Sequence, residues 1–92
     1  MYLEIVSPEA TLFAGEVDSV IVPGSAGYFQ MLNNHASIVS SLKEGVVKIS
    51  GKIDLDDAVK DKFQMENANT TLFKINSGTV EMRDNKLILL AD

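Results

Sequence analysis

The sequence predicts an all-β protein, a small β-sandwich or flattened barrel of about eight to ten short strands. Three observations favour this class. Apolar residues alternate with polar ones in short runs, most clearly in residues 46–53, which is the spacing of a half-buried strand. Turn-forming pairs such as Pro23-Gly24 and Asp84-Asn85 separate the runs. The length of 92 residues suits one domain, so residues 1–92 are expected to form a single sandwich.

The first half of the chain is expected to hold five strands. Ser7-Pro8 ends the first strand, because proline removes a hydrogen-bond donor from the ladder. Gly15 offers the next turn, and the glycines of the loop at residues 23–27 can take positive φ. The five strands are predicted at residues 2–6, 9–13, 17–22, 29–32 and 36–42.

The second half continues the pattern, with a tight turn at residues 43–45 before the alternating run. Further strands are predicted at residues 71–75, 79–82 and 87–90. The stretch of residues 54–63 departs from this rhythm, because Leu55, Val59 and other apolar residues stand at helical spacing behind Asp54, which could cap a helix. The sequence therefore allows one short helix near residues 54–63, with a solvated connector as the other interpretation.

Charge and cysteine content exclude several classes of function. The net charge is −5, and the first basic residue is Lys43, so phosphate backbones and anionic lipid headgroups would be repelled. The chain has no Cys, which rules out disulfides and thiolate metal sites. No signal peptide or long apolar run is recognisable, so we expect a soluble protein of the intracellular type.

Catalytic, cofactor and metal motifs are also missing. His35 is the only imidazole, and Ser37 near it lacks the Gly-x-Ser-x-Gly elbow of a nucleophile. No phosphate-binding glycine loop is present. A calcium loop beginning at Asp54 would need Gly and Glu where Val59 and Met65 stand. We therefore expect no catalytic residue, no cofactor and no metal site.

One strand is expected to carry a contact surface. Adjacent side chains on a strand point to opposite faces, so the run of residues 28–32 must leave an apolar member exposed. Exposed aromatic or Met side chains beside glycine turns are typical of protein contacts. Ordinary packing is the alternative interpretation.

Five segments together resemble a known family. They are residues 3–9, 12–17, 17–36, 77–82 and 85–92, and within the third an apolar strand stops at Pro23-Gly24, passes Gly27 and closes on Asn34-His35-Ala36. In this order they resemble the N-terminal β-sandwich domain of the epsilon subunit of rotary F-type ATP synthases.

The resemblance implies a non-catalytic part of the central stalk, which couples the gamma shaft to the membrane c-ring during proton-driven ATP synthesis. Its partners would be gamma and the c-ring, and its place the cytoplasmic face of the bacterial inner membrane, as a peripheral part of F1. By position, the resemblance assigns to the c-ring contact Tyr28, Gln30, Met31, Asn33, Asn34 and His35.

Many members of this family continue into a helical hairpin that can inhibit hydrolysis, whereas this chain stops at Asp92. If the natural protein also ends there, we expect no inhibition of that kind. Two other classes of function stay open from the residues alone. A free-standing adaptor or ligand-binding sandwich would be a stable monomer with a pocket, and an enzyme would lose activity when His35 is changed.

Overall fold

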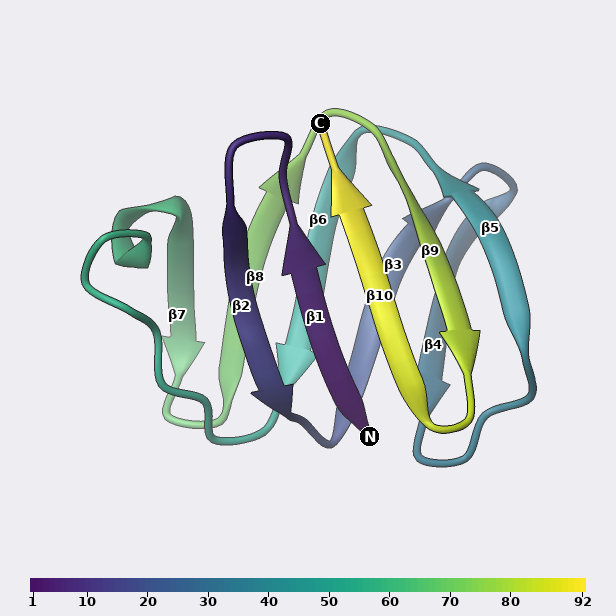
Figure 1. Ribbon diagram of the computed structural model, residues 1–92, viewed down its shortest axis with the longest axis horizontal. Helices are drawn as coiled ribbons and strands as arrows, with labels where there is room; N and C mark the ends of the chain where they lie inside the picture. Colours follow the sequence, from purple (N-terminus) through teal and green to yellow (C-terminus); the bar gives the residue numbers. More distant parts are fainter.

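The computed structural model describes residues 1–92 and contains ten β-strands and one short 3-10 turn, η1 (Figure 1). This confirms the all-β prediction. The structure contains no helix that is long and apolar enough to cross a membrane. The elements are β1 (Tyr2–Val6), β2 (Thr11–Glu16), β3 (Ser19–Gly24), β4 (Gly27–Leu32), β5 (Ile38–Leu42), β6 (Gly45–Ser50), η1 (Lys60–Lys62), β7 (Phe63–Asn67), β8 (Thr70–Ile75), β9 (Gly78–Arg83) and β10 (Lys86–Ala91).

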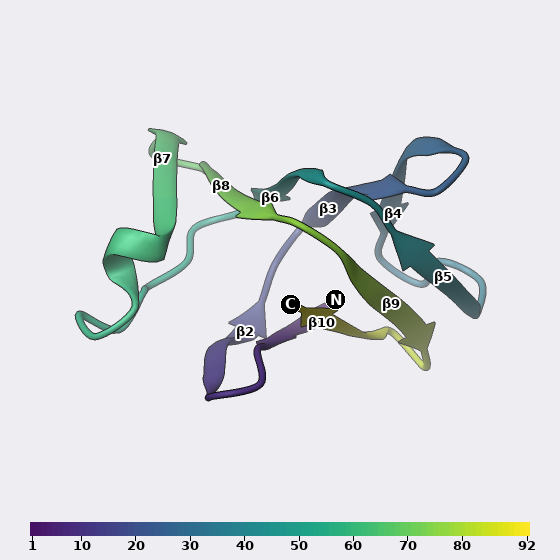
Figure 2. The ribbon, with the colours of Figure 1, turned by 90° about the horizontal axis from the view of Figure 1, so that it is seen from above.

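The strands form one sheet that curls until its two halves face each other. The order is β2-β1-β10-β9-β5-β3-β6-β8-β7, and β4 pairs with β3 beside this path. The halves are joined where β3 meets β5, at the single pair Gly24 and Leu42. Seen from above, β2, β1 and β10 lie opposite β6 and β8, and β7 stands at the side away from β5 (Figure 2). The fold is therefore a half-open barrel whose closed side carries β3, β4 and β5.

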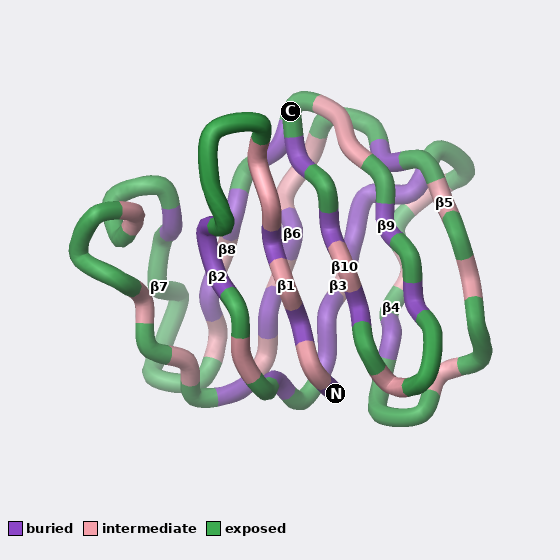
Figure 3. The backbone as a smooth tube through the Cα atoms, in the orientation of Figure 1, coloured by how far each residue is buried: buried purple, intermediate pink, exposed green.

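The interior is built mainly by alternation along the strands, with β3 as an exception that is buried along most of its length. Leu3 and Ile5 of β1 and Leu87 and Leu89 of β10 are fully buried, whereas the residues between them are partly exposed (Figure 3). The facing strands repeat the pattern, and 20 apolar residues form one buried cluster. A period of two places every second side chain on the inner face, so the facing halves of the sheet share this core.

The first and last strands of the chain lie side by side. β1 pairs with β10 in parallel, from Tyr2 opposite Lys86 to Val6 opposite Leu90. All the other pairings are antiparallel. This one parallel pairing brings the start of the chain to the hairpin between β9 and β10.

Two glycine positions differ from the prediction. Gly15 lies inside β2 rather than in a turn, and an added Cβ there would come within 3.1 Å of the Phe13 ring. A glycine in a strand often marks such a close approach, which the sequence pattern does not reveal. The predicted loop at residues 23–27 is also shorter, because Pro23 and Gly24 belong to β3.

The stretch of residues 54–63 contains only η1 rather than a longer helix. The side chain of Asp56 accepts a hydrogen bond from the backbone N–H of Ala58 at 2.9 Å, a local turn that competes with helix formation. The stretch is also more than a solvated connector, since Leu55 and Val59 pack against the core, as does Ile53 just before it. It leads into β7, a strand that the sequence did not predict, where Phe63 stacks on Phe73 with 4.8 Å between ring centroids.

Neighbouring leucines of β10 provide a test of this core. Leu89 has no exposed surface, whereas Leu90 is 48% exposed. Leu89→Ala should lower the free energy of unfolding by about 2–5 kcal/mol, because it leaves a cavity in the buried cluster. Leu90→Ala should stay within about 0.5 kcal/mol of the unaltered chain. Urea denaturation measures both, and equal losses would contradict the inward direction of Leu89.

Candidate functional site

The six candidate contact residues lie on β4 and in the turn that follows it. β4 is an edge strand that pairs only with β3, from Ser19 opposite Leu32 to Gly24 opposite Gly27. Tyr28 and Gln30 are exposed on the outer face of this strand. Asn33 and Asn34 are exposed in the turn, and His35 is half-buried beside them.

Met31 is the exception, because its side chain is fully buried in the core. The prediction grouped odd and even positions of one strand, but side chains at odd and even positions point to opposite faces. Met31 is therefore corrected from a contact residue to a core residue. The same alternation exposes Leu32, at 54%. Leu32 stands two residues after Gln30 and four after Tyr28, and this period of two could have placed it on the same face from the sequence alone.

Tyr28 is exposed yet held in place. Its Oη accepts a hydrogen bond from the backbone N–H of Val46 at 3.0 Å, which fastens the ring across the start of β6. An added Cβ at Gly45 would lie 2.6 Å from this Oη and 2.7 Å from Cβ of Pro23. Only glycine at position 45 leaves room for the ring in this position.

The turn after β4 is closed by its own backbone. The N–H of His35 donates to the carbonyl oxygen of Leu32 at 3.1 Å, and Asn34 between them has φ of 61°. Asparagine is one of the few residues that tolerate a positive φ in a turn. The Nδ1 atom of His35 lies 2.7 Å from the carbonyl oxygen of Ala36, a hydrogen bond when Nδ1 carries the proton. The polar contact of the imidazole is thus to the backbone of the next residue.

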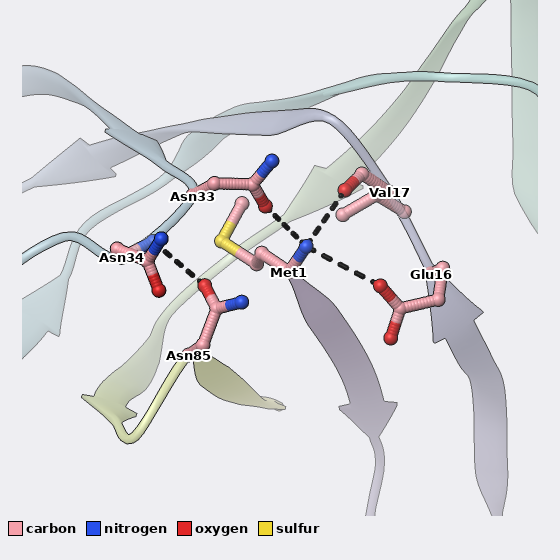
Figure 4. A network of polar contacts seen from close by, with 6 residues as sticks. All are labelled: Met1, Glu16, Val17, Asn33, Asn34 and Asn85. Carbon is pink, nitrogen blue, oxygen red and sulfur yellow. Dashed lines mark hydrogen bonds and ion pairs between the residues drawn. The ribbon is translucent and has the colours of Figure 1, made fainter.

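Polar contacts tie the turn to two distant segments (Figure 4). The amino group of Met1 donates hydrogen bonds to the side-chain oxygen of Asn33 and, at 3.2 Å, to the carbonyl oxygen of Val17. The backbone N–H of Asn34 donates to Oδ1 of Asn85 at 2.7 Å. The turn is therefore fastened to the start of β1 and to the hairpin between β9 and β10.

The arrangement suits contact with another macromolecule better than chemistry. The site combines neutral polar side chains on a fastened turn with exposed apolar groups on the adjoining strand, at Tyr28 and Leu32. No three His, Cys, Asp or Glu side chains come together as metal ligands. A cleft lined by Ser7, Lys62, Phe73 and other residues includes no part of β4.

Known proteins resemble the chain over its whole length. Residues 1–92 match the family described as "ATP synthase, Delta/Epsilon chain, beta-sandwich domain". A protein of Campylobacter curvus named "ATP synthase epsilon chain" is 37% identical over 92 residues, which are 100% of this chain and 60% of the relative. A protein of the same name from Chlorobium limicola is 40% identical over 90 residues, 98% of this chain and 86% of the relative. The chain thus spans only part of the Campylobacter relative's length.

Solved structures share the fold at low sequence identity. A chain from the structure of the Tetrahymena thermophila mitochondrial ATP synthase, "central stalk/cring", superposes with a TM-score of 0.74 at 14% identity, covering 99% of this chain and 62% of that one. A chain from the Euglena gracilis mitochondrial ATP synthase gives a TM-score of 0.73, also at 14% identity, covering 97% and 48%. At this identity the likeness concerns the fold.

The close approach at Gly45 generates a prediction for Tyr28. Gly45→Ala should lower the free energy of unfolding by about 1–3 kcal/mol, because the new methyl group must displace the Tyr28 ring or Pro23. Gly45 has no positive φ, so the cost is steric.

A double-mutant cycle in urea, with Tyr28→Phe as the second change, is the measurement. The alanine should cost less in that background, because the closest contact atom, the Oη, is gone. An equal cost in both backgrounds would contradict a clash with the Tyr28 Oη and assign the whole cost to Pro23.

Proposed function

Since the chain belongs to the family of ATP synthase delta/epsilon β-sandwich domains, we propose that it acts as a non-catalytic subunit of the central stalk. In this role it couples the gamma shaft to the membrane c-ring during proton-driven ATP synthesis. The observation that carries the proposal is the family match over residues 1–92. The names of the relatives agree with it, and so does the shared fold of the Tetrahymena chain.

The mechanism is mechanical. Torque passes from the ring to gamma without slippage only if the linking part is stiff and bound on two sides. The ten-stranded sheet around one buried cluster supplies stiffness. Stable interfaces bury about 800 Å² on each partner. The accessible surface of 5362 Å² is large enough for two separate patches of that size.

The proposed ring-facing surface consists of Tyr28, Gln30, Leu32, Asn33, Asn34 and His35. Leu32 joins it because of its exposure, and Met31 leaves it because of its burial. At a rise of about 3.3 Å per residue, the strand part from Tyr28 to Leu32 is about 13 Å long, so one interface of ordinary size can span it together with the turn that follows. The surface carries no charged residue, and so it suits contact with uncharged polar loops of the ring.

The proposed location follows from the role. As a component of F1, the protein is peripheral on the cytoplasmic face of the bacterial inner membrane and is held there through its partners. Its net charge of −5 offers no attraction to anionic lipid headgroups, so recruitment by protein contacts fits the composition better than direct lipid binding.

Association with cognate partners tests the assignment. The purified chain should co-elute in a stoichiometric complex with gamma, and with an F1 and c-ring assembly stripped of its own epsilon. Failure with a folded gamma would reject the stalk role and favour a free-standing adaptor.

A second measurement tests the ring-facing surface. The double variant Asn34→Gly with His35→Ala keeps a residue that accepts the positive φ of the turn but removes both side chains. It should bind the ring about tenfold more weakly, with binding to gamma alone retained. Gln64→Ala is the control, because Gln64 is exposed on β7 at the other side of the molecule (Figure 1). If both variants bind the ring like the unaltered chain, the surface is assigned to the wrong residues.

A further inference from the structure

The hairpin between β9 and β10 has unusual backbone geometry. Asp84 and Asn85 are its two loop residues, between the paired residues Arg83 and Lys86. Both have positive φ, at 52° and 60°. A two-residue hairpin with positive φ at both positions is a type I′ turn, for which asparagine and aspartate are well suited.

Asn85 uses this geometry to contact two other segments. Its backbone carbonyl oxygen accepts a hydrogen bond from the N–H of Tyr2 at 3.0 Å. Its side-chain Oδ1 accepts one from the N–H of Asn34 at 2.7 Å. Asn34 also has a positive φ, so two left-handed turns that lie 51 residues apart in the sequence are bonded directly. The contact is visible beside the Met1 amino group in Figure 4.

The turn at Asn34 needs such support because no strand ladder holds it. β4 ends at Leu32 and β5 begins at Ile38, which leaves residues 33–37 outside both strands. Within the turn, the backbone bond from His35 to Leu32 fixes the curvature but not the direction in which the turn projects. Two contacts anchor the turn from outside: the Met1 amino group holds the side chain of Asn33, and Asn85 in the hairpin between β9 and β10 holds the backbone N–H of Asn34.

We propose that Asn85 is a positioning residue for the turn of residues 33–35, which we call the contact turn. By holding the backbone N–H of Asn34, it sets the direction in which the side chains of residues 33–35 project, although Asn85 lies in a distant part of the sequence. The inference rests on the proposed function, because it concerns the same ring-facing surface. Asparagine combines tolerance of positive φ with a side-chain acceptor, whereas glycine offers only the first property.

Asn85→Gly is the decisive variant. It keeps the positive φ and the backbone bond to Tyr2 but removes the acceptor of the Asn34 N–H. The amide proton of Asn34 should exchange with solvent about fivefold faster in NMR spectra of the 92-residue chain, and its resonance should shift. Affinity for the F1 and c-ring assembly should fall by a similar factor, because the turn loses its backbone anchor and keeps only the bond from Met1 to the Asn33 side chain.

Two matched variants separate positioning from general destabilisation. Asp84→Gly changes the other positive-φ residue of the same hairpin, whose side chain makes no hydrogen bond to the turn, and should leave both readouts unchanged. Asn85→Asp retains a side-chain oxygen at the same place and should restore slow exchange at Asn34 and most of the ring affinity.

The outcomes show separately whether Asn85 holds the turn and whether ring binding depends on that contact. Unchanged exchange at Asn34 in Asn85→Gly overturns the proposal, because the side chain then does not hold the turn. Faster exchange with unchanged ring affinity also overturns it, because the turn then does not depend on this support for binding. If the unaltered chain fails to bind the ring, the proposed function fails and the ring-binding role of Asn85 fails with it. The exchange data still decide separately whether Asn85 holds the turn.

Discussion

The parallel pairing of β1 with β10 is the constraint on which the rest of the structure depends. It places the fully buried Leu3, Ile5, Leu87 and Leu89 side by side in the centre of one half of the sheet. Parallel neighbours cannot be joined by a tight turn, and here β1 and β10 are the first and last strands, so every other element lies in the connection between them. The chain therefore runs around the barrel before it closes, and the same pairing carries the hairpin at Asn85 to the start of β1.

The core and the contact surface are separate sets of residues on the same strand. Met31 anchors β4 from the inside, while Tyr28, Gln30 and Leu32 face outward. Changes on the outer face therefore leave the buried cluster intact, and the surface can be adapted to a partner without loss of the fold. Hydrogen bonds to Val46, Met1 and Asn85 compensate for the weak support that an edge strand and its following turn receive from the sheet.

This arrangement is consistent with a protein that works by binding and stiffness. A contact turn that moves freely would lose affinity through the entropy of ordering on binding, and it would transmit force poorly. Here the turn is already bonded, without any partner, to Met1 before β1 and to Asn85 in the hairpin between β9 and β10. The segment of residues 51–69 has a different role, since Ile53, Leu55 and Phe63 extend the core beside β8 and add β7 as a further edge.

The sequence by itself determined most of the strand pattern, the turn at Asp84-Asn85, and the need for an exposed apolar side chain within residues 28–32, because alternation and turn chemistry are local properties. It also carried the family resemblance. Tertiary structure alone decided that Met31 points inward, that Gly15 lies under a ring, and that β7 forms a strand. It also decided that Asn85 meets Asn34, because that contact depends on strand pairings between the two ends of the chain, which no local pattern specifies.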